Sequence, residues 1–124
     1  MKAAKDFLEE ANTVVPRLSA EDAIAKYKAG GCIFVDVRDS GTIAQSGTIA
    51  GAHRIARGMI EFVADSATPM HNDVMKKDAE IYLVCGAGGQ AALAGKTLKD
   101  MGFENVTNIG GFGDWKAAGG DVEG

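Results

Sequence analysis

A cysteine stands where an apolar run meets a glycine-rich loop, a position suited to a nucleophile. Cys85 ends the run Glu80–Cys85 and is followed by the glycine-rich segment Gly86–Gln90. The apolar, β-branched and aromatic residues of the run predict a buried strand, and Gln90–Met101 predicts a helix that Gly102 ends. The thiol then faces backbone N–H groups at a helix N-terminus, whose partial positive charge favours the thiolate. The sequence therefore predicts that this cysteine is a nucleophile.

Three phosphate-binding alternatives for the same loop are disfavoured by the surrounding residues. Gly86–Ala91 fits the dinucleotide pattern G-x-G-x-x-A, but fewer than 40 residues follow it, which leaves little room for a cofactor domain. Gly95–Thr97 lacks the first glycine of a phosphate loop, because that position is Gln90. A cysteine-dependent phosphatase needs a longer loop that ends in arginine, whereas Gln90 and Ala91 end this one.

Strands alternate with helices along the chain, which predicts an α/β fold with a mostly parallel sheet. We expect an N-terminal helical extension over residues 1–13 and one domain over residues 14–124. Strands are expected at 14–18, 33–37, 80–85 and 104–109, a short strand or turn at 48–53, and helices at 2–12, 19–30, 39–47, 57–63 and 90–101. Active sites of such sheets lie beyond the carboxyl ends of the strands, where Cys85 falls.

Composition narrows the class of function. The 124 residues carry a formal net charge of −4 and no cluster of Lys and Arg, so nucleic-acid and membrane binding are disfavoured. No signal-like apolar run is present, which favours the cytoplasm. His53 and His71 have no metal-ligand spacing and no CxxC pair occurs, so no metal site is expected. Cys32 is interpreted as a small core or strand-edge residue, with a redox partnership to Cys85 as the alternative.

Four segments, in their order and spacing, together resemble a single-domain rhodanese: Val35–Asp39, Gly47–Ala52, Cys85 with its six-residue loop, and Gly110–Trp115. The resemblance covers roughly residues 17–122. It implies a rhodanese-like fold whose mostly parallel sheet has about five strands with helices on both faces. It also implies a sulfurtransferase without cofactor, in which Cys85 takes sulfur from a small donor such as thiosulfate as a persulfide. The acceptor would be cyanide or a thiol, including a protein thiol.

The resemblance assigns further residues to the site. Backbone N–H groups of the loop would cradle the transferred sulfur, and these belong to Gly86, Ala87, Gly88, Gly89, Gln90 and Ala91. The family commonly has arginine where this chain has Gln90, which predicts weaker binding of a dianion and reduced activity. Arg57 is a candidate replacement cation at the rim of the loop, or else a solvated helix residue. Asp36 and Arg38 are expected to form a structural pair near the site, with a tuning role as the alternative.

Two other functions stay open at the level of sequence. The loss of the loop arginine favours a rhodanese-homology binding or regulatory module with little turnover. A reducible thiol sensor would pair Cys85 with Cys32. The retained cysteine and its glycine loop favour sulfur transfer over both.

Overall fold

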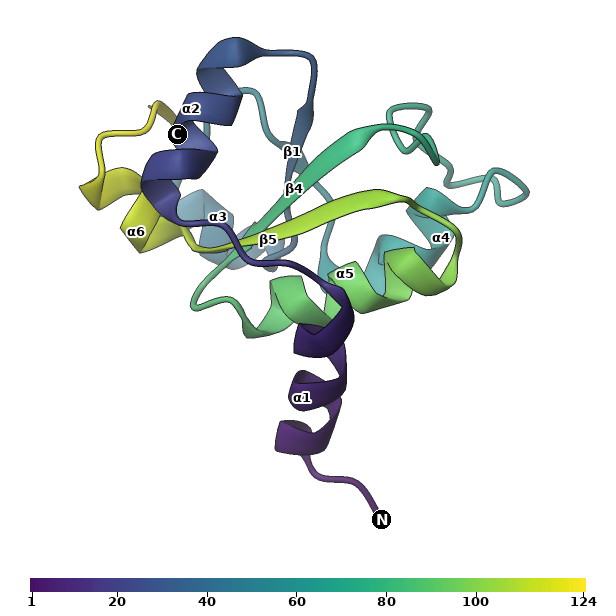
Figure 1. Ribbon diagram of the computed structural model, residues 1–124. Coiled ribbons are helices and arrows are strands. Elements are labelled where there is room, and N and C mark those ends of the chain that lie inside the picture. The colour runs from purple at the N-terminus through teal and green to yellow at the C-terminus, as the bar shows by residue number, and fades with distance from the viewer.

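The computed structural model describes residues 1–124 and has a parallel sheet at its centre. The strands are β1 (Ile33–Asp36), β3 (His53–Arg54), β4 (Glu80–Cys85) and β5 (Asn105–Gly111). They lie in the order β3-β1-β4-β5, and all three pairings are parallel (Figure 1). A separate antiparallel pair joins β2 (Thr48–Ile49) to β6 (Val122–Glu123). The predicted α/β class is confirmed.

Helices cover both faces of the sheet, as predicted. They are α1 (Ala4–Val14), α2 (Ala20–Ala29), α3 (Ser40–Ser46), the 3-10 turn η1 (Arg57–Met59) continued by α4 (Ile60–Ala64), α5 (Gly89–Asp100) and α6 (Phe112–Ala117). Figure 1 shows α4 and α5 on one side of the sheet and α2 and α6 on the other. No helix is both long enough and apolar enough to cross a membrane.

The two faces of the sheet carry two separate cores, because successive strand residues point to opposite sides. Val35 and Leu83 lie in the cluster beneath α4 and α5. Phe34 and Tyr82 lie in the cluster beneath α2 and α6, where their rings stack with centroids 5.0 Å apart. Trp115 of α6 belongs to the second cluster, so this C-terminal helix packs on the sheet. Because the strands are parallel, their carboxyl ends all lie at the same end of this sheet.

The sheet has four strands rather than about five, because the expected strand at 14–18 is reduced to one bridge. Helix α1 continues through Val14, and α2 begins at Ala20, so little chain remains between them. Arg17 alone bridges to Asn108 of β5. The Leu18 N–H donates to the Asn108 carbonyl at 3.0 Å, and the Asn108 N–H donates to the Pro16 carbonyl at 2.9 Å. Proline has no N–H with which to extend this ladder.

Helix α1 packs against α5 and projects beyond it towards the N-terminus (Figure 1). Leu8 contacts the start of α5 at Gly89, and Val15 packs against Gly95 in the middle of that helix. A Cβ at Gly95 would lie 2.8 Å from a Val15 methyl group, so the absence of a side chain permits this approach. The N-terminal helix therefore docks on the element that begins at the cysteine loop.

Candidate active site

Cys85 is the last residue of β4, one of the two strands that pair with neighbours on both sides. Its side chain belongs to the core cluster beneath α5 and is only 1% exposed. The chain then turns through Gly86 and Ala87, which are exposed, into the N-terminus of α5 at Gly89. The sulfur is therefore buried beneath the loop, and a reagent has to approach it past the exposed residues Gly86 and Ala87.

Two backbone N–H groups of the loop point at the sulfur. The Gly88 N–H donates to Cys85 Sγ at 3.0 Å, and the Ala91 N–H donates at 3.3 Å. Of the six backbone N–H groups predicted to face the sulfur, those of residues 86–91, these two form hydrogen bonds with it. Both donors favour negative charge on it, and they lie at the positive end of the α5 dipole. The arrangement is suited to holding a thiolate.

The loop reaches this geometry through glycine at its turn. Gly88 has φ +102°, a left-handed conformation that residues with a Cβ rarely adopt. This conformation turns the Gly88 N–H back towards the sulfur while the Gly88 carbonyl starts α5 by accepting from Ala92 at 3.0 Å. The N–H and the carbonyl of this one residue thus link the sulfur to the start of the helix.

A buried asparagine on β5, which the sequence did not indicate, anchors the loop. Asn108 is fully buried. Its Nδ2 donates to the Gly88 carbonyl at 2.9 Å, and its Oδ1 accepts from the Gly110 N–H at 2.8 Å. Next to it, a Cβ on Gly111 would collide with the Gly86 carbonyl oxygen. The end of β5 therefore fixes the loop from the side. The one available sequence signal was a polar residue within a strand of apolar and small residues.

The loop itself carries no charged side chain. Gln90 is exposed in the first turn of α5, and its side chain makes no hydrogen bond within the protein. The other loop residues are glycine and alanine. Any positive charge near the sulfur, beyond the backbone dipoles, has to come from another segment.

Arg57 binds elsewhere. Its Nη1 lies 3.2 Å from Glu61 Oε1, and its Nη2 donates to Thr97 Oγ1 at 3.1 Å. Thr97 is six residues beyond Ala91 in α5, which corresponds to roughly 9 Å along the helix axis. The structure therefore joins Arg57 to the C-terminal half of α5, and none of its side-chain hydrogen bonds is with the loop.

Asp36 and Arg38 form a buried ion pair at the end of β1. Arg38 Nη2 lies 2.7 Å from Asp36 Oδ2, and Arg38 Nε lies 3.1 Å from Oδ1. The Thr48 hydroxyl also donates to Asp36 at 2.7 Å, and the Gly47 carbonyl accepts from Arg38 at 2.9 Å. The Phe112 ring covers the guanidinium at 4.7 Å. The pair ties β1 to the segment before β2 and to α6.

Cys32 lies at the opposite end of the sheet from Cys85. It directly precedes β1, whose first residue Ile33 pairs with Ile81 of β4. Cys32 is therefore level with Glu80, and five strand residues, or roughly 16 Å, separate the two cysteines along the strands. A disulfide needs Cα atoms about 4.4–6.8 Å apart. The alternative in which these cysteines pair within one chain is wrong for this fold.

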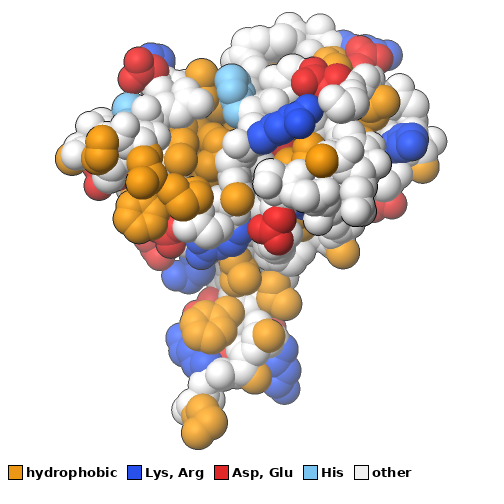
Figure 2. Space-filling model, turned by 180° about the vertical axis from the view of Figure 1, so that it is seen from behind, with side chains coloured by type: hydrophobic (Ala, Val, Ile, Leu, Met, Phe, Trp, Pro, Cys, Tyr) orange, Lys and Arg blue, Asp and Glu red, His pale blue; other side chains and the backbone are white.

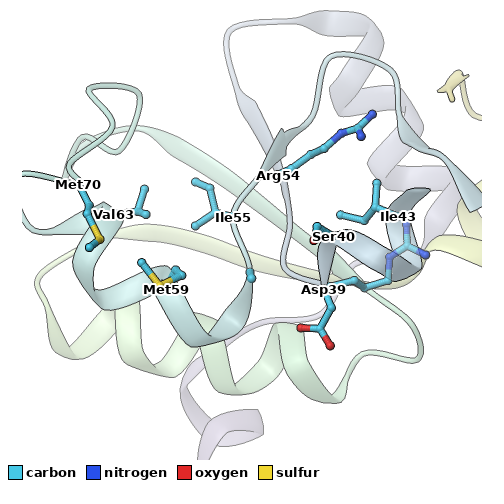
Figure 3. Close-up of a pocket in the computed structure, with 10 residues that line it drawn as sticks. Asp39, Ser40, Ile43, Arg54, Ile55, Met59, Val63 and Met70 are labelled. Atoms are coloured by element: carbon cyan, nitrogen blue, oxygen red, sulfur yellow. The ribbon is translucent and has the colours of Figure 1, made fainter. Parts of the chain in front are cut away.

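A groove of about 460 Å³ opens at the carboxyl ends of β1 and β3. Figure 3 shows Met59, Val63 and Met70 at one end of it and Ile43 and Arg54 at the other. Cys85 does not line this groove. Hydrophobic side chains gather on the same face (Figure 2), and Phe62 of α4 is 50% exposed rather than part of the core. The Cys85 sulfur and the largest groove are thus separate features at the carboxyl ends of the strands.

Sequence comparison places the fold in a known group. The sequence model of the rhodanese-like domain matches residues 19–118. The chain is 30% identical to the thiosulfate sulfurtransferase GlpE of Pseudomonas putida over 103 residues, covering 82% of this chain and 84% of that protein. It is 43% identical over 53 residues to the adenylyltransferase and sulfurtransferase UBA4 of Candida albicans, which covers 42% of this chain and only 12% of that longer protein.

One solved structure is similar in fold over nearly the whole length of this chain. It is a Rhodopseudomonas palustris protein of unknown function, described as a possible tyrosine phosphatase. The two are 39% identical with a TM-score of 0.93, over 99% of this chain and 96% of the other. The family match spans both the cysteine loop and the Asp36–Arg38 pair, and so the chain belongs to the rhodanese-like domain family.

Proposed function

We propose that this protein transfers sulfane sulfur through a persulfide on Cys85. The observation that carries the proposal is the pair of N–H groups of Gly88 and Ala91, which donate to Sγ at 3.0 and 3.3 Å. Such donors stabilise the thiolate, which is the form of cysteine that attacks sulfur. The relatives named sulfurtransferases support the same chemistry.

The reaction divides into two displacements at sulfur. In the first, the Cys85 thiolate attacks the outer sulfur of thiosulfate, an S–S bond forms, and sulfite leaves with the electron pair of the broken bond. In the second, cyanide or a thiolate attacks the terminal sulfur of the persulfide, and the Cys85 thiolate leaves. Neither step consumes an oxidant or a cofactor. The thiolate acceptor belongs to a small thiol or to a protein thiol.

The loop is suited to both states of the cysteine. The terminal sulfur of a persulfide is an anion, and exposed backbone at Gly86 and Ala87 leaves room for it beside the remaining N–H groups. No side chain larger than alanine stands between Cys85 and Gln90. Since Gln90 carries no charge, we expect thiosulfate to bind more weakly than in relatives that have arginine at this position. The free thiols of this protein fit a reducing compartment such as the cytoplasm.

A binding or regulatory module is the second candidate, and the uncharged Gln90 favours it. Such a module would keep the fold without turning over a sulfur donor. A tyrosine phosphatase is not proposed, because the loop ends in Gln90 and Ala91 and has no arginine to hold a phosphate. The two candidates differ in one measurable property, which is whether the cysteine takes up sulfur.

The test is the intact mass of the protein after incubation with thiosulfate and, separately, with 3-mercaptopyruvate. We expect the mass to increase by one sulfur atom and to return to its starting value after treatment with a thiol reductant. Cys85→Ser should abolish the gain, and Cys32→Ser, the matched control at the far end of the sheet, should retain it. No gain with either donor would refute the proposal for these donors and favour the binding module.

A further inference from the structure

Arg17 places a guanidinium against the outside of the cysteine loop. Its backbone is held beside β5 by the bridge to Asn108. A Cβ added to Gly88 would lie 2.5 Å from Arg17 Nη1, and one added to Gly110 would lie 3.3 Å from Nη2. The guanidinium therefore packs on the backbone of two glycines, one of which donates its N–H to the reactive sulfur.

Arg17 differs from the other three arginines of the chain in having no acidic partner. Arg38 is paired with Asp36, and Arg54 and Arg57 lie beside glutamates at 3.6 and 3.2 Å. Arg17 is exposed and makes neither an ion pair nor a side-chain hydrogen bond within the protein. A charge with all its donors free at the rim of a site is available to a ligand.

The distances connect this charge to the chemistry. The Gly88 nitrogen lies 3.0 Å from Cys85 Sγ. The Arg17 guanidinium fills the position that a Cβ on Gly88 would occupy, with Nη1 2.5 Å from it. Covalent geometry then places Arg17 Nη1 within roughly 8 Å of the sulfur. A donor in contact with the sulfur would therefore lie within the range over which this charge acts at low salt.

We propose that Arg17 supplies the positive charge that Gln90 does not, and that it selects anionic sulfur donors for Cys85. The proposal rests on the proposed sulfur transfer. In water, one positive charge about 8 Å from the two charges of thiosulfate corresponds to roughly a fivefold change in affinity at low salt. Screening at high salt removes most of that effect, because the Debye length falls to about 3 Å at 1 M.

The first test compares Arg17→Gln, Arg17→Lys and the control Lys76→Gln, which removes one positive charge from an exposed loop residue. Arg17→Gln should raise the KM for thiosulfate about fivefold at low salt and much less at high salt. Arg17→Lys should retain most of the affinity, and Lys76→Gln should match the wild type. An unchanged KM in Arg17→Gln would overturn the proposal, as would an equal increase in Arg17→Gln and Arg17→Lys, which would indicate packing alone.

A second test does not depend on sulfur transfer. Iodoacetate and iodoacetamide alkylate the same sulfur and differ by one negative charge. The ratio of their rates at Cys85, followed by peptide mass, should fall about twofold in Arg17→Gln and remain unchanged in Lys76→Gln. If the wild type takes no sulfur from thiosulfate but this ratio falls, the proposed function fails while the role of Arg17 stands. If the ratio does not fall, the role of Arg17 is refuted.

Discussion

Replacing Asn108 by alanine removes the hydrogen bond with which β5 holds the cysteine loop at Gly88 and a second hydrogen bond within β5, to the Gly110 N–H. The Gly110 N–H is then left buried without a partner, which costs about 1–3 kcal/mol. The Gly88 carbonyl keeps its bond from Ala92, so losing the asparagine bond there costs only the net value of one hydrogen bond, about 1 kcal/mol. We therefore expect Asn108→Ala to lower the free energy of unfolding by about 2–4 kcal/mol.

The assay is urea unfolding followed by fluorescence of Trp115, the single tryptophan, with linear extrapolation to water. Asn105→Ala is the matched control, because Asn105 is an exposed residue of the same strand, and we expect it to change stability by less than about 0.5 kcal/mol. Asn108→Asp adds a sharper comparison. It keeps the acceptor for Gly110 but turns an acceptor towards the Gly88 carbonyl, so it should also be destabilised.

The same variants report on the site. Release of the Gly88 carbonyl should loosen the N–H group that donates to Cys85, so sulfur uptake by Asn108→Ala should be slower than by Asn105→Ala at equal folded fraction. If the two alanine variants have equal stability within about 0.5 kcal/mol and equal rates of sulfur uptake, the reasoning that β5 anchors the loop is refuted.

Three further substitutions and treatments test other parts of the structure. Gly111→Ala should lower the free energy of unfolding in urea by about 1–3 kcal/mol and reduce sulfur uptake measured by mass, because its Cβ would displace the Gly86 carbonyl. The control Gly113→Ala, whose Cβ would enter open space, should change neither quantity. Arg38→Met should cost about 3–5 kcal/mol in urea unfolding, because it leaves its carboxylate partner on β1 buried and unpaired. Burial, and then a neighbouring carboxylate, raise the pKa of the Cys32 thiol. Its alkylation at pH 8 should therefore be slower in the folded protein than in urea, and peptide mass mapping that finds equal rates would contradict this.

Local signals along the chain were sufficient for the elements that form the site. The apolar run before Cys85, the glycines after it and the helix that follows were all predicted, and β4 and α5 confirm the strand and the helix. These features depend on neighbouring residues, through side-chain period and the conformational freedom of glycine. The expected strand at 14–18 was wrong in extent, because the end of one helix and the start of the next leave room for a single bridge at Arg17.

The residues that complete the site come from segments distant in sequence. Asn108 reaches the loop only because β5 lies beside β4 with Asn108 opposite Leu83, and Arg17 reaches it only because the segment before α2 bridges to β5. Arg57 is the opposite case: its place in the sequence was compatible with the rim of the cysteine loop, but in the structure its guanidinium donates to Thr97 of α5. The sequence by itself determined the place of Cys85 at the end of its strand and the loop backbone that faces it, since these are contiguous. Only the tertiary structure decided which side chains anchor that loop and which charge stands beside it, because strand register and helix packing set those distances.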